Sequence, residues 1–258
     1  MAILQLESRN VFGTTGSGNQ KKQWVGTKLI KLNSKFHEAS KEVSACILGA
    51  SLGLPIVHYV KSEYLYKGKK YVGCECDTFL KTNEISISLY QIILAENVIV
   101  TNNISSMDYF NNVVIAIYNY TNGGLSVKNI QDYLLKILVF DFIICNEDRH
   151  LTNIEFIYDE HTKKWRFAPI YDNGQSFLGR DGGLTKLQIE TKLRKFKTKT
   201  FSINPYKNLI DINVAKNIAL EFKRNLDSKY GSIDNLPINE FHKTIVKMQI
   251  ERLLNKRT

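Results

Sequence analysis

The sequence predicts an α+β protein with two lobes, a small β-rich lobe followed by a larger helical lobe. Two observations predict this order. Runs rich in β-branched and aromatic residues dominate the first 80 residues, whereas helical periodicity dominates the remainder. A chain of 258 residues that is 43% hydrophobic can bury a core in one larger domain or two small lobes. We therefore expect an N-terminal lobe at residues 1–80 and a C-terminal lobe at residues 81–258.

The N-terminal lobe combines three predicted strands with one helix between the first and the second. Val43, Cys46, Ile47 and Ala50 recur at i, i+3, i+4 and i+7, which indicates the helix, and Gly53 is the glycine expected just beyond its end. The strands are predicted at residues 23–32, 56–66 and 70–76, the last two joined by a turn at 67–69.

The C-terminal lobe is predicted to be helical apart from one short hairpin. Its helices are expected at residues 85–98, 106–120, 127–144, 212–229 and 239–254. The hairpin is expected at residues 153–158 and 165–168, with its turn near His161.

The charge of the chain favours acidic partners. The formal net charge is +10, which suits phosphates, nucleic acid or an acidic protein surface without choosing among them. One short segment is especially basic, and it is either a solvated surface or a docking site for a negatively charged partner. Its basic residues are Lys186, Lys192, Arg194, Lys195, Lys197 and Lys199.

We expect a cytoplasmic protein without a membrane partner, and secretion as an effector stays an open alternative. The first ten residues lack a charged start followed by an apolar run. The most apolar stretch, residues 133–145, is too short to span a bilayer and contains Lys136 and Asp141. We expect the four cysteines to be reduced thiols packed as small hydrophobic residues.

Three polar residues around the predicted hairpin carry the chemistry. Asp148 and Asn153 form the D-x-x-x-x-N pattern of a kinase catalytic loop, and Asp172 follows the hairpin, where a kinase has its metal-binding Asp. Phosphoryl transfer requires an aligned nucleophile and neutralised phosphates. Asp148 would accept the proton of the attacking hydroxyl or orient that hydroxyl, whereas the oxygens of Asn153 and Asp172 suit Mg²⁺. D-x-x-x-x-N alone is common in polar turns, so the prediction depends on the joint pattern.

The segment around these residues resembles the HipA-like kinases, the toxin kinases of bacterial toxin–antitoxin systems. Residues 146–153 read NEDRHLTN and match the family's N-x-D-x-H-x-x-N, while residues 168–172 read APIYD and match its P-x-Y/F-D. The D-R-H-x-x-N string is also similar to the catalytic loop of phosphatidylinositol kinases. The resemblance implies a two-lobed, protein-kinase-like fold and a Ser/Thr protein kinase that uses ATP and Mg²⁺.

The resemblance extends to a glycine loop near the N-terminus. Residues 14–22 read TTGSGNQKK and align with the family's G-x-Q-x-K, which covers the ATP phosphates. A Gly/Ser/Thr cluster by itself is more often a flexible turn. Thr15 aligns with the hydroxyl residue that becomes autophosphorylated in HipA proteins, and Thr14 and Ser17 are alternatives to it. The implied phosphate-binding residues are Thr15, Gly16, Ser17, Gly18 and Gln20.

Four more residues are implied to bind the nucleotide. Lys31 corresponds to the lysine that holds the α- and β-phosphates, and Glu42, expected to open the first helix, is its natural partner. A surface lysine and an exposed first-turn glutamate are the simpler readings. Glu75 and Cys76 lie at the expected lobe junction, where the backbone would bind adenine. Asp141 interrupts an apolar helix face, and we expect it to support the catalytic loop, as we do for His150, which also belongs to the predicted catalytic set.

The resemblance also implies partners and leaves alternatives open. Only about a dozen residues precede the glycine loop, so the chain resembles the short HipT-like and CtkA-like kinases, without the additional N-terminal subdomain of HipA. Implied partners are a protein substrate, such as an aminoacyl-tRNA synthetase or another translation factor, and an antitoxin protein. Direct nucleic-acid binding stays open. The alternatives are a lipid or small-molecule kinase and a nucleotide-binding pseudokinase that transfers no phosphate.

Overall fold

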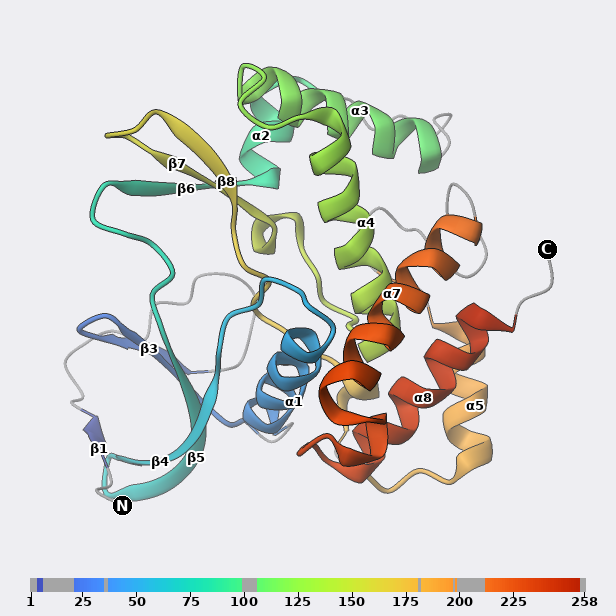
Figure 1. Ribbon diagram of the computed structural model, residues 1–258. Coiled ribbons are helices and arrows are strands. Elements are labelled where there is room, and N and C mark those ends of the chain that lie inside the picture. Colours follow the sequence, from blue (N-terminus) through green and yellow to red (C-terminus); the bar gives the residue numbers. More distant parts are fainter. Residues whose placement is uncertain are drawn as a thin grey trace.

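The computed structural model describes residues 4–6, 21–34, 37–98, 106–180, 182–196, 198 and 212–255. In Figure 1 a sheet and one helix form one part of the molecule and a larger helical part lies beside them. The first sheet has five strands in the order β1-β4-β5-β3-β2, with β1 parallel to β4 and the other pairs antiparallel. Its strands are β1 (Leu4–Leu6), β2 (Lys22–Val25), β3 (Lys28–Leu32), β4 (Val60–Tyr66) and β5 (Lys69–Asp77).

Helix α1 (Glu38–Ser51) lies between this sheet and the helical part (Figure 1). Ala39 and Cys46 on α1 pack with Cys74 and Cys76 of β5 in an apolar cluster. The helix ends as predicted, because Gly53 adopts a left-handed conformation with φ of 80° two residues beyond it. On its other side, α1 contacts α7, and Asn225 donates a hydrogen bond of 2.8 Å to the Leu52 carbonyl.

The second part is built around helix α4, which is buried along most of its length. A second antiparallel sheet, in the order β6-β7-β8, lies beside the helices. Its strands are β6 (Glu84–Ser88), β7 (Glu155–Asp159) and β8 (Lys164–Phe167). The helices are α2 (Leu89–Ala95), α3 (Ser106–Tyr120), α4 (Val127–Ile144), α5 (Lys186–Lys195), α7 (Ile212–Tyr230) and α8 (Glu240–Leu254). Short 3₁₀ turns are η1 (Leu151–Asn153), η2 (Phe177–Gly179) and η4 (Ile233–Asn235).

Three predicted elements differ from the structure. The strand predicted at 23–32 is the hairpin β2–β3, because Gly26 with φ of 60° allows a tight turn in its middle. The helix predicted at 85–98 begins with strand β6, in which serine and isoleucine alternate, and α2 starts only at the capping box of Ser88 and Gln91. Strand β4 begins at Val60, and within 56–59 only Ile56 forms a bridge, to Ile170.

Helix α5 was not among the predicted elements, although its start has a capping box of Thr185 and Gln188. The four cysteines are buried free thiols, as predicted. Within the described ranges, no helix is long and apolar enough to cross a membrane.

Candidate active site

The loop that contains Asp148 begins where α4 ends. Cys145 adopts a left-handed conformation with φ of 52°, which stops the helix, and the Asn146 N–H donates to the Asp141 carbonyl at 2.8 Å. The Asn146 side chain then holds both sides of the turn. Its amide nitrogen donates to the Asp141 carboxylate at 3.1 Å, and its oxygen accepts from the Asp148 N–H at 3.1 Å. Part of the predicted support of this loop by Asp141 therefore acts through Asn146.

Arg149 holds the loop from its buried side. Its guanidinium is 1% exposed and donates to both oxygens of the buried Asp141, at 3.1 and 3.0 Å. It also donates to the Tyr171 carbonyl and, at 2.6 Å, to the Asn173 side chain. Burial alone would lower the pKa of Arg149, but the Asp141 carboxylate raises it, so the guanidinium stays charged. One side chain thus joins α4, the loop and the segment around Asp172.

The Asp172 carboxylate contacts three other polar side chains. The hairpin β7–β8 returns the chain to the loop, and Asp172 itself has φ of 60°. One of its oxygens accepts from Lys31 at 2.8 Å and lies 3.5 Å from the Lys22 ammonium. The other oxygen accepts from the Asn153 amide at 3.1 Å. Asn153, which is 19 positions away in the chain, and two lysines of the first sheet therefore converge on the Asp172 carboxylate.

Glu42 joins the first part of the molecule to this cluster. Its side chain is fully buried and binds Lys31 at 2.5 Å through one oxygen. The other oxygen accepts from the Asn173 N–H at 2.8 Å. The predicted ion pair between Lys31 and Glu42 is present, but Glu42 does not open α1, since the helix begins one turn earlier at Glu38. Gly174 lies close to α1 here, and a Cβ at this position would lie 3.1 Å from the Glu38 Cβ.

The mutual contacts set the charges of these groups. Burial alone would raise the pKa of Asp172, but the ammonium groups of Lys31 and Lys22 hold it well below its usual range. Burial likewise would lower the pKa of Lys31, and the carboxylates of Asp172 and Glu42 raise it well above its usual range. The site therefore contains a charged lysine between two carboxylates, one of which faces the outside.

Asp148 and His150 lie at the exposed side of the same loop. Their side chains are 45% and 37% exposed, and His150 Nε2 lies 2.8 Å from Asp148 Oδ1. Both side chains are accessible, so Asp148 can contact a hydroxyl group that approaches from solvent. His150 can orient the Asp148 carboxylate. His150 contacts the Asp148 side chain, whereas we had expected it to support the loop.

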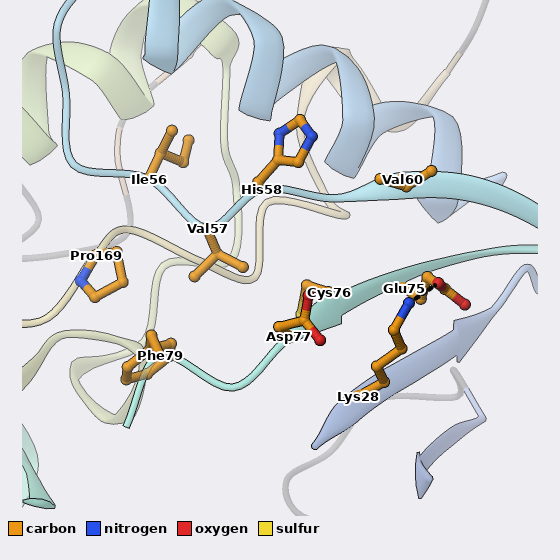
Figure 2. A pocket seen from close by; sticks show the side chains of 10 residues that line it. All are labelled: Lys28, Ile56, Val57, His58, Val60, Glu75, Cys76, Asp77, Phe79 and Pro169. Atoms are coloured by element: carbon orange, nitrogen blue, oxygen red, sulfur yellow. Dashed lines mark hydrogen bonds and ion pairs between the residues drawn. The ribbon is translucent and has the colours of Figure 1, made fainter. Parts of the chain in front are cut away.

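A cavity of about 280 Å³ lies at the junction of the two parts (Figure 2). The ladder between β4 and β5 ends at the pair Val60 and Glu75, so the two chains diverge beyond it and leave this space. Its lining residues are Lys28, Ile56, Val57, His58, Val60, Glu75, Cys76, Asp77, Phe79 and Pro169.

The two residues predicted at the junction both line this cavity, but their side chains are already engaged. The Glu75 carboxylate binds Lys28 at 2.6 Å and accepts from the Tyr64 hydroxyl at 2.9 Å. Burial raises the pKa of the Cys76 thiol to about 11, so this thiol is neutral near pH 7. Any recognition of a ligand by these two positions would therefore use the backbone more than the side chains.

Direct contacts thus bring together Lys31, Glu42, Asn153 and Asp172, with Asp148 and His150 as a second pair on the same loop. The predicted glycine-loop residues Thr15, Gly16, Ser17, Gly18 and Gln20 lie outside the described residues, as do Lys197 and Lys199. In the basic segment, the side chains of Lys186, Lys192, Arg194 and Lys195 are exposed on α5.

The sequence reasoning missed three residues of the site. These are Arg149, Asn173 and Asn146, each directly beside or two positions from a predicted residue. Asn146 opens the N-x-D-x-H-x-x-N pattern, which is the signal that could have found it, whereas Arg149 and Asn173 stand among polar residues and gave none.

The fold and this cluster define a two-lobed, kinase-like protein. A family model described as the HipA-like C-terminal domain matches residues 101–230, and the chain belongs to that family. No curated protein matches the chain.

Two solved structures are similar to the chain. The Helicobacter pylori proinflammatory kinase CtkA is 21% identical, over 91% of this chain and 90% of that one, with a TM-score of 0.59. HipA, from the Shewanella oneidensis MR-1 toxin–antitoxin complex with HipB and its operator DNA, is 13% identical, over 92% of this chain and 63% of that one, with a TM-score of 0.51. These likenesses confirm the predicted α+β, kinase-like fold.

Proposed function

We propose that this chain is an ATP- and Mg²⁺-dependent Ser/Thr protein kinase of the HipA-like toxin class. The observation that carries the proposal is the chain of contacts from Glu42 through Lys31 to Asp172, with Asn153 on the second Asp172 oxygen. A buried lysine between two carboxylates is the arrangement that protein kinases use, because the lysine can hold phosphates while one carboxylate holds the metal. We further propose that residues 1–80 and 81–258 are the two lobes.

The residues present fit Mg²⁺. Asp172 is ionised and partly exposed, and Asn153 lies beside it, so the pair offers the hard oxygen ligands that Mg²⁺ prefers. The Asn153 amide now donates to Asp172, and it must rotate to present its oxygen. Bound Mg²⁺ would neutralise charge on the phosphates. Lys31 would hold the α- and β-phosphates, while Glu42 keeps the ammonium in place.

Asp148 would receive the proton of the attacking substrate hydroxyl. It is exposed enough to meet a protein substrate, and His150 at 2.8 Å would orient its carboxylate. The base of the nucleotide would bind at the junction beside Glu75 and Cys76, through backbone groups. Thr15, Gly16, Ser17, Gly18 and Gln20 would cover the phosphates, as in the family's glycine loop.

Replacement of Asp172 by Asn tests the metal site. The change keeps the shape of the side chain, and Asn tolerates a φ of 60°. It removes the charged oxygen ligand, so we expect the Mg²⁺-dependent gain in ATP affinity to fall by about 10- to 100-fold. Titration of a fluorescent ATP analogue with and without Mg²⁺ measures this gain. Incorporation of labelled phosphate into protein measures phosphoryl transfer.

Asp159→Asn is the matched control, because it removes the same charge from a turn at the far end of β7. An unchanged Mg²⁺ dependence in Asp172→Asn would remove Asp172 from the metal site. Absence of Mg²⁺-dependent turnover in the wild-type protein would instead favour the pseudokinase alternative.

We propose a protein substrate and an antitoxin partner, in the cytoplasm. HipA was solved with HipB, which supports an antitoxin partner for this chain. An aminoacyl-tRNA synthetase or another translation factor is the substrate class that the family suggests, and the exposed basic face of α5 suits an acidic region of such a substrate. Phosphosite mapping after a pull-down from the native cell would separate this reading from a lipid or small-molecule kinase.

We also expect autophosphorylation in the glycine loop. Thr15, or its neighbours Thr14 and Ser17, would gain a phosphate that adds close to two negative charges near the anionic phosphates of ATP. Repulsion would then lower activity as modification proceeds. To test this, the protein is incubated with Mg²⁺ and ATP. Mass spectrometry of the tryptic peptide that contains residues 14–17 follows the phosphorylation, and the rate of phosphate transfer is measured at the same times.

Asp148→Asn protein is the control for this modification, since it should gain no phosphate by itself. A peptide that stays unmodified while the wild-type enzyme turns over would rule out self-inhibition and leave the kinase proposal standing.

A further inference from the structure

His242 contacts both α1 and the segment that follows Asp172, from a distant part of the chain. It lies in the first turn of α8, is fully buried and is 198 positions from its partner Ser44 on α1. Its Nδ1 lies 2.9 Å from the Ser44 hydroxyl, and its Nε2 lies 3.3 Å from the Arg180 carbonyl. A carbonyl can only accept, so Nε2 carries a proton and donates to the Arg180 carbonyl, and in the neutral ring Nδ1 accepts from the Ser44 hydroxyl.

The segment that His242 contacts has an unusual backbone. Phe177, Leu178 and Gly179 are successive left-handed residues with φ of 56°, 59° and 68°. Bulky side chains rarely adopt this conformation, and it persists only where surrounding contacts hold it. The ring of His242 stacks on Phe177 with centroids 3.9 Å apart and an angle of 14° between the planes. His242 therefore holds this segment through stacking and through the Arg180 carbonyl.

The same segment leads directly from Asp172. Asn173 bonds to Glu42 through its N–H, and Gly174 lies against Glu38, so the start of the segment is tied to α1. Ser44 lies two positions from Glu42 on the same helix, and His242 ties it to the end of the segment. Residues 173–180 are thus attached to α1 at both ends, first through Glu42 and then through His242.

We propose that His242 is a positioning residue for phosphoryl transfer, which fixes residues 173–180 against α1 and so sets Asp172 and Glu42 relative to Lys31. This inference rests on the proposed kinase function for its catalytic consequence, but the clamp itself can be measured without activity. Without His242, the left-handed residues would relax, and the fraction of molecules with a competent site would fall.

The test uses two variants. His242→Phe keeps an aromatic ring on Phe177 and removes both hydrogen bonds of His242. His242→Gln retains a donor toward the Arg180 carbonyl. Arg180 is exposed, so trypsin can report how often the segment opens. We expect cleavage after Arg180, identified by mass spectrometry, to be about fivefold faster in His242→Phe and less accelerated in His242→Gln. We expect kcat to fall about tenfold, because misplaced catalytic groups slow the chemical step.

Lys243→Met is the matched control. Its side chain is buried in the next position of α8, but it binds the Asp234 carbonyl and Glu240, away from the segment. Faster cleavage after Arg180 in both His242 variants but not in Lys243→Met would support the clamp. Cleavage at the wild-type or Lys243→Met rate in His242→Phe would overturn it, whatever the activity. If both His242 variants are cleaved faster while the wild-type protein itself transfers no phosphate, the clamp stands and the proposed kinase function fails.

Discussion

Replacement of Asp148 by Asn is expected to lower kcat for phosphate transfer by about 10²- to 10⁴-fold, the usual contribution of a general base. The new amide cannot accept the proton of the attacking hydroxyl at neutral pH. ATP binding should change little, because Lys31, Asn153 and Asp172 keep their contacts. Folding should also change little, since the pair of Asp148 with His150 is partly exposed and exposed pairs contribute only about 0–1 kcal/mol. Transfer of labelled phosphate and the midpoint of thermal unfolding measure the two effects.

Asp234→Asn is the control, because Asp234 also forms an exposed ion pair, with Lys247, outside the proposed site. His150→Asn is informative as well. If His150 only orients Asp148, its replacement should lower kcat less than the replacement of Asp148 does. Turnover close to wild type in a folded Asp148→Asn protein would show that another group accepts the proton.

Local patterns in the sequence predicted much of this fold. Helices α3 and α4 begin and end where their periodicity predicts, because each has a continuous apolar face that must be buried. The pair of Lys31 and Glu42 was also predictable, since a charged residue on a half-buried strand and one on the following helix need partners. These are short-range features, within about a dozen positions of each other.

The sequence could not show contacts between distant parts of the chain. Arg149 stands in a polar loop and reads as a surface residue, yet it is buried and bonds to Asn173, 24 positions further along the chain. His242 reads as a polar position of an amphipathic helix, yet it packs on Phe177. The β6 strand was missed for a different reason. Five residues that alternate in polarity give too little signal beside an apolar helical run.

The buried pair of Arg149 and Asp141 is expected to give the largest stability effect. Replacement of Arg149 by Met leaves the Asp141 carboxylate, which is fully buried, with only Asn146 as a side-chain partner among the contacts described above. Loss of one partner of a buried pair typically costs about 3–5 kcal/mol. For a chain of this size that corresponds to a fall in the unfolding midpoint of about 6–20 °C. Denaturant unfolding followed by circular dichroism measures the change.

Replacement of both partners separates stability from positioning. In Arg149→Met/Asp141→Asn no uncompensated charge remains, and the new amide can still bond to Asn146, so we expect at least half of the lost free energy of unfolding to return. Activity should not return with it. Without the guanidinium, neither the Tyr171 carbonyl nor the Asn173 side chain is tied to the loop, and Asp172 lies between them. A stable double variant with wild-type kcat would show that Arg149 serves folding alone. A stable double variant with low kcat would show that the buried pair of Arg149 and Asp141 also positions the loop of Asp148 and the segment around Asp172.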